Sequence, residues 1–136
     1  FAQFPGKAPW HLKFARRGLV DIEFIAQTLQ LLEGHATPLV LHSNTVGALN
    51  ALAQANAIEA ADAVTLMAAA ELQTALMQVL RIAVDGEFDA AAATPGLKAL
   101  LTRAGGEDSF AQLEAKLRRL QADVAAIFEK RIAAPA

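Results

Sequence analysis

Hydrophobic positions recur every three or four residues in several segments of the chain, which is the spacing of one face of an α-helix. The first such segment, residues 18–34, carries a stripe formed by Leu19, Ile22, Ile25, Ala26, Leu29 and Leu32. A second apolar flank on the same segment consists of Val20, Phe24 and Leu31. The pattern therefore predicts a helix that is covered on two sides, or that shares its second flank with a missing partner.

Two further helices are predicted before residue 85. Ser43 or Asn44 offers an N-cap for the second helix, which ends near Asn56, because short polar side chains accept from free backbone N–H groups. The third helix runs from Ile58 to about residue 84 and ends before Gly86. Its predicted buried stripe consists of Ala61, Val64, Ala68, Leu72, Ala75, Leu76, Val79, Ile82 and Ala83.

The last third of the chain carries two helix-start signals. Thr94 followed by Pro95 predicts a short fourth helix, since proline at the first helical position loses no hydrogen bond, and Gly105–Gly106 ends it. Ser109 and Gln112 have capping-box spacing ahead of a fifth helix whose apolar positions run to Phe128. We therefore predict an all-α, up-down bundle of about five helices over residues 18–136, preceded by an irregular lead-in over residues 1–17 from a missing upstream domain.

Composition supports a folded helical domain without indicating a function. The chain has 136 residues, of which 54% are hydrophobic and 19% charged, and it lacks cysteine and tyrosine. The sequence lacks an uncharged run long enough to predict a membrane span. The absence of cysteine fits a cytoplasmic protein. A formal net charge of -2 gives no electrostatic attraction to nucleic acid.

Few residues have the spacing of a chemical site. Asp21 and Glu23 have the spacing of a metal clamp, but residues two apart on a helix point about 200° from each other. Asp21 fits better as a favourable charge in a first helical turn, and the three histidines have no ligand spacing. Lys13, Arg16 and Arg17 form a basic turn before the first helix that could face phosphate, although a solvated surface is the simpler interpretation. We predict neither a catalytic residue nor a metal site in this chain.

The segment from Leu12 to Gln27, LKFARRGLVDIEFIAQ, closely resembles the opening of the helical domain of glutamine synthetase adenylyltransferases. The resemblance continues through residues 31–32, 35, 44–45, 48–49, 52–53 and 80–81, and through 110–117 and 124–128. The resemblance implies that the motif and domain-interface residues are Lys13, Gly18, Asp21, Glu23, Phe24 and Gln27, which cap the helix and bridge to the neighbouring domain rather than catalyse. The chain departs from the motif at two positions, where His11 replaces an aspartate and Arg17 replaces a glycine.

The resemblance implies a parent enzyme that uses ATP and Mg²⁺ to attach AMP to a tyrosine of glutamine synthetase in bacterial nitrogen regulation, with a second half that removes it. The family's catalytic Gly-Ser turn and Asp-x-Asp pair are absent from this chain. It is therefore expected to be inactive alone and to represent the C-terminal helical domain, which packs beside a nucleotidyltransferase domain. Glutamine synthetase and a PII signal protein are the expected partners. Two alternatives remain, namely the equivalent domain of a PII uridylyltransferase and a free-standing helical interaction module.

Overall fold

The computed structural model describes residues 10, 18–33, 45–83 and 88–133. Within these ranges the chain forms helices and turns and no strand. The α-helices are α1 (Leu19–Glu33), α2 (Thr45–Gln54), α3 (Ala60–Ala83), α4 (Pro95–Ala104) and α5 (Phe110–Phe128). A 3₁₀ turn, η2 (Ala90–Ala92), precedes α4, and a π-helical turn, η3 (Glu129–Ala133), continues α5. The predicted all-α bundle is confirmed.

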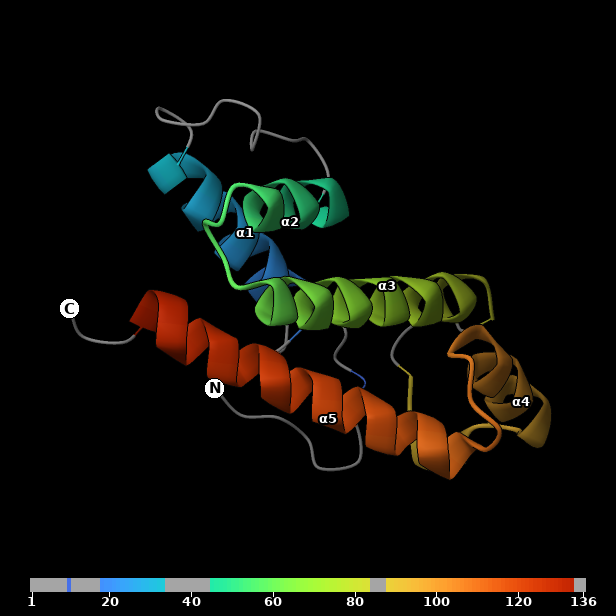
Figure 1. Ribbon diagram of the computed structural model, residues 1–136. Coiled ribbons are helices and arrows are strands. Elements are labelled where there is room, and N and C mark those ends of the chain that lie inside the picture. Colours follow the sequence, from blue (N-terminus) through green and yellow to red (C-terminus); the bar gives the residue numbers. More distant parts are fainter. Residues whose placement is uncertain (1–9, 11–17, 34–44, 84–87, 134–136) are drawn as a thin grey trace.

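The long helix α3 lies at the centre of the bundle (Figure 1). It contacts α1 and α2 on one side and α4 and α5 on the other, and it runs antiparallel to both α2 and α5. The largest fully buried side chains come from all five helices and include Ile22, Ile25, Leu49, Leu52, Leu66, Leu76, Leu101, Leu113, Leu117 and Val124. One continuous core therefore joins the two sides of α3.

The helix ends follow their sequence signals closely. The Thr94 hydroxyl accepts from the Leu97 N–H at 3.2 Å, and the Ser109 hydroxyl accepts from the Gln112 N–H at 3.1 Å. At the end of α2, Asn56 has a left-handed φ of 60°, and the Ala57 N–H donates to the Leu52 carbonyl at 2.9 Å. This is the hydrogen-bond pattern with which glycine or asparagine commonly ends a helix.

The predicted buried face of α3 was wrong in part. Leu72 and Leu76 are buried, but Val64 is 62% exposed and Ile82 is 89% exposed, and Ala61, Ala68 and Ala83 are also exposed. The side buried instead carries Ala63, Leu66, Ala69, Ala70, Leu72, Gln73 and Leu76. This alanine-rich helix has two apolar faces, and the face with the larger leucine side chains enters the core because it removes more apolar area from water.

The helix α3 is long and apolar enough, by length and composition, to cross a membrane. The criterion of an uncharged run missed it, because Asp62, Glu71 and Arg81 interrupt the apolar sequence of this helix. A buried core helix meets the same criterion, and α3 packs against α1, α2, α4 and α5. Its packing in the bundle accounts for the apolar composition of its inner face.

A buried amide pair connects α3 to α5. The Gln121 side-chain N–H donates to Gln73 Oε1 at 3.1 Å, and the Gln73 side-chain N–H donates to the Ala69 carbonyl at 3.3 Å. Gln73 is completely buried and Gln121 is 4% exposed. Because an unpaired buried amide is costly, this pair favours one register of α3 against α5.

Candidate functional site on the outer face of α1

The residues of the family motif lie on or directly before α1, as far as the structure describes them. Gly18 is buried, and its carbonyl accepts from the Ile22 N–H at 3.3 Å, so it forms the start of the helix. Asp21 lies in the first turn, where its negative charge is favourable. Lys13, Arg16 and Arg17 lie outside the described residues, so the predicted phosphate-facing turn stays a prediction.

One face of α1 is apolar and turned away from the core. At about 100° per residue, Val20, Phe24, Gln27 and Leu31 fall on the same side of the helix, opposite the buried Ile22. Phe24 is 48% exposed and Leu31 is 77% exposed. Leu32, which was predicted in the buried stripe, is 71% exposed. The second flank predicted from the sequence is therefore present on α1, and the described residues cover it only in part.

Phe24 extends this outer face toward the end of α5. Its ring lies 6.0 Å from the ring of Phe128, with an interplanar angle of 30°. Aromatic rings at such a separation attract one another beyond the effect of their buried area. The outer face of α1, defined here as Val20, Phe24, Gln27 and Leu31, thus meets α5 through the contact of Phe24 with Phe128.

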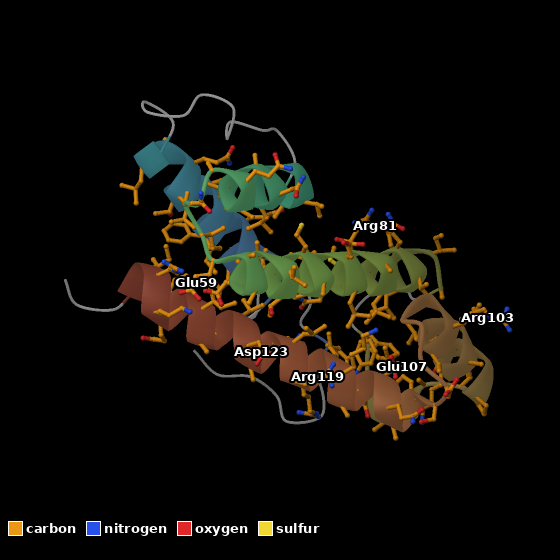
Figure 2. All side chains as sticks on the ribbon, viewed as in Figure 1. Glu59, Arg81, Arg103, Glu107, Arg119 and Asp123 are labelled. Atoms are coloured by element: carbon orange, nitrogen blue, oxygen red, sulfur yellow. The ribbon has the colours of Figure 1, made fainter. Side chains whose placement is uncertain are left out.

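A charged cluster joins the start of α3 to η3, the turn that follows Phe128. Lys130 Nζ lies 2.8 Å from Asp62 Oδ2, and Arg131 Nη2 lies 3.1 Å from Glu59 Oε1. Figure 2 shows Glu59 between the start of α3 and the C-terminal end of α5. The side chain of Asp62 is only 14% exposed, which weakens screening of its pairs by water. The cluster links the turn that follows Phe128 to the start of α3.

A groove lies on another side of α1, between that helix, the start of α2 and the second half of α3. Its volume is about 480 Å³, and apolar lining residues outnumber charged ones. The charged lining residues are Glu23 and Glu71, and the described lining includes no basic side chain. The lining residues are Leu19, Glu23, Thr45, Val46, Ala70, Glu71, Thr74, Ala75 and Gln78. Glu23 therefore belongs to this groove rather than to the outer face of α1.

Sequence reasoning missed an aromatic anchor near the start of the chain. Trp10 is 6% exposed, stacks on Phe110 at 5.6 Å and meets Phe88 edge-on at 5.1 Å. Its indole N–H donates to a Glu114 carboxylate oxygen at 2.9 Å. Only the presence of a single tryptophan in the predicted irregular lead-in hinted at this role. Although the domain boundary at residue 17 stays a prediction, Trp10 packs in the core of the bundle.

The described residues contain no group of three or more histidine, cysteine, aspartate or glutamate side chains arranged to hold a metal ion. Asp21 and Glu23 point to different surroundings, because Glu23 lines the groove and Asp21 is half-buried in the first turn. The strongest features of the described bundle are thus surfaces, namely the outer face of α1 and the groove beside it.

Comparison with known families accounts for the motif on α1. A sequence model described as GlnD PII-uridylyltransferase matches residues 7–132. The chain belongs to this family. Curated relatives named "Bifunctional glutamine synthetase adenylyltransferase/adenylyl-removing enzyme" also match, and they confirm the resemblance to adenylyltransferases in the sequence.

Three of these family members illustrate the extent of the match. The protein from Rhodopseudomonas palustris strain TIE-1 is 42% identical over 123 residues, or 90% of this chain. The protein from Xanthobacter autotrophicus is 43% identical over 121 residues, or 89% of the chain, and that from Bradyrhizobium diazoefficiens is 37% identical over 119 residues, or 88%. In each case the chain spans 12% of the length of the relative. The similarity to these larger family members thus concerns one region of each.

Proposed function

We propose that this chain is a helical accessory domain of a longer enzyme that adenylylates glutamine synthetase and, in another part, removes the AMP. The observation that carries the proposal is the 42% identity over 90% of the chain to relatives named for both activities. Those relatives contain about eight times the length of this chain, which leaves room for separate catalytic domains. We also propose that the bundle lies at the C-terminal end of the parent enzyme.

In this proposal the chemistry belongs to the remaining part of the enzyme. The Gly-Ser turn and Asp-x-Asp pair that hold the triphosphate and Mg²⁺ in the resembling transferases are absent from the sequence. The described residues do not fit a Mg²⁺ site, since the carboxylates of Asp21 and Glu23 lie on different sides of α1. We therefore assign ATP and Mg²⁺ to the neighbouring domain, and we place the enzyme in the cytoplasm.

The bundle contributes packing and docking. The outer face of α1 presents Val20, Phe24 and Leu31, which together form an apolar strip along one helix. Exposed apolar patches of this kind commonly mark protein contacts. We assign this strip to the adjoining nucleotidyltransferase domain, because the motif of the family lies on the same helix and most of the relatives' length lies outside this chain.

Calorimetric titration of the purified chain tests the assignment of roles. We expect heat on addition of glutamine synthetase and none on addition of Mg²⁺-ATP, because this chain would supply a docking surface and no nucleotide site. Saturable nucleotide binding would contradict the proposal and would move Lys13, Arg16 and Arg17 into a nucleotide site. Absence of heat with glutamine synthetase would remove substrate docking and leave packing as the role of the bundle.

Substitution of Phe24 in the full-length enzyme tests the assigned interface. We expect Phe24→Asp to lower the rate of glutamine synthetase adenylylation about tenfold. The substitution removes the aromatic ring from the centre of the interface and places a charge there instead. Leu100→Asp on α4 is a matched control, because Leu100 is 52% exposed and Phe24 is 48% exposed. Equal activity of the two variants, with equal solubility, would contradict the interface at α1.

A second candidate function is the equivalent helical domain of a PII uridylyltransferase. The observation in its favour is the description of the matching family model, which names that enzyme. Titration with a purified PII protein in the same buffer distinguishes the two candidates. Binding of PII without binding of glutamine synthetase would favour this second function, and the reverse result would favour the first.

A further inference from the structure

The exposed side of α3 carries a regular stripe that the bundle does not use. Its members are Ala61, Val64, Ala68, Glu71, Ala75, Gln78 and Ile82, spaced alternately three and four residues apart. This seven-residue repeat is the spacing of a helix that packs against another helix along its length. The repeats start at residues 61, 68, 75 and 82, and the first three of these residues are alanine. Small side chains at these positions let a partner helix approach closely. The stripe covers about 32 Å of helix at 1.5 Å per residue.

The stripe continues into the groove between α1, α2 and α3. Glu71, Ala75 and Gln78 belong to both, so the groove and the stripe form one surface, termed here the α3 surface. Glu23 stands on the α1 side of the groove and is exposed, as is Glu71 on the α3 side. Arg81, the basic residue in the last turn of α3, lies like the groove on the side of α3 turned away from α5 (Figure 2), but it is not among the lining residues. The two glutamates therefore lie near the middle of the stripe, and the described lining around them carries no basic side chain.

Charge decides which kind of helix fits this surface. In a two-fold pairing of two copies of this chain, the central Glu71 of each copy would face the other, and like charges at such a contact repel. A partner helix with arginine or lysine opposite Glu23 and Glu71 would instead form ion pairs. The α3 surface therefore fits a basic amphipathic helix better than a second copy of itself.

We propose that the α3 surface binds a basic amphipathic helix of about 20 residues from the remaining part of the parent polypeptide. The parent polypeptide is long enough to supply this helix, because the chain spans only 12% of the length of its relatives. The inference rests on the proposed function in one respect, namely that the chain is a domain of a longer enzyme. It adds a second contact between domains, on a different helix from the outer face of α1.

Overlapping 25-residue peptides that cover the remaining part of the parent sequence test this inference against the purified 136-residue chain. We expect one basic, helix-forming peptide to bind, as measured by fluorescence anisotropy. The double variant Glu23→Gln/Glu71→Gln should weaken its binding about tenfold, as expected for the loss of two partly exposed ion pairs. The double variant Asp108→Asn/Asp123→Asn removes the same charge elsewhere and should leave the affinity within about twofold.

A second pair of variants tests the apolar stripe. Ala68→Glu inserts a long charged side chain at the point of closest approach and should abolish peptide binding. Ala122→Glu places the same residue on an exposed position of α5 and should have no effect. Failure of every peptide to bind, or equal binding to the Ala68→Glu and Ala122→Glu variants, would overturn the inference. The peptide-binding measurements use no glutamine synthetase. The calorimetric titration therefore tests the proposed function independently of this inference.

Discussion

At the scale of single residues, Gly105 shows how closely α3, α4 and α5 pack. A Cβ atom added at Gly105 would overlap the buried Leu113 side chain and would lie 3.3 Å from Leu72 Cδ1. We expect Gly105→Ala to lower the free energy of unfolding by about 1–3 kcal/mol, because an overpacked core must shift. Gly96→Ala, where nothing lies within 4 Å, should instead raise it by about 0.5–1 kcal/mol. Urea unfolding measures both, and changes of the same sign would contradict this account.

At the scale of elements, α5 depends on a cap at its start. The Ser109 hydroxyl accepts from the Gln112 N–H and also donates to the Gln112 side-chain oxygen at 3.2 Å. We expect Ser109→Ala to cost about 1 kcal/mol of stability, since one N–H at the helix start loses its partner. Ser109→Asp keeps an acceptor and adds a favourable charge, so it should unfold at or above the temperature of the unaltered chain. Thermal unfolding followed by circular dichroism measures the difference, and equal losses in both variants would exclude capping as the cause.

At the scale of the whole molecule, Trp10 connects a position near the start of the chain to α5. It packs with Phe88 and Phe110 and donates to Glu114, a residue 104 positions away. We expect Trp10→Ala to lower the free energy of unfolding by about 3–5 kcal/mol, as typical for truncation of a large buried aromatic side chain. Trp10→Phe, which keeps a ring but loses the hydrogen bond, should cost less than half as much. Urea unfolding followed by circular dichroism measures both, and a loss below about 1 kcal/mol for Trp10→Ala would show that the anchor contributes little.

Interactions within a few residues of one another explain why most of the bundle is predictable from sequence. The starts of α4 and α5 follow from Thr94 and Ser109, and the ends of α2 and α4 follow from Asn56 and Gly106, which has a φ of 72°. The outer face of α1 was also predictable, because Val20, Phe24 and Leu31 stand apart from the core stripe in any helix drawn through them. The family motif marked the same helix as the candidate site.

The contacts that complete the site were not predictable in this way. The groove brings Glu23 together with Glu71, and the charged cluster brings Glu59 together with Arg131, 72 positions away. The hydrophobic periodicity of a single helix does not predict either pair, because the two members of each pair belong to different elements. Sequence reasoning therefore found the outer face of α1 and missed the groove beside it, because the groove exists only where three helices meet.

The sequence by itself determined the helical class, the order of the elements, most of their ends and the family, because helix periods, caps and motifs depend on residues close together in the chain. The tertiary structure decided which of the two apolar faces of α3 is buried, where Trp10 packs, and that Gln73 pairs with Gln121. These outcomes depend on the fit of side chains from distant segments. Burial of the larger leucine face of α3 removes more apolar area from water, and it leaves the alanine face available for a partner.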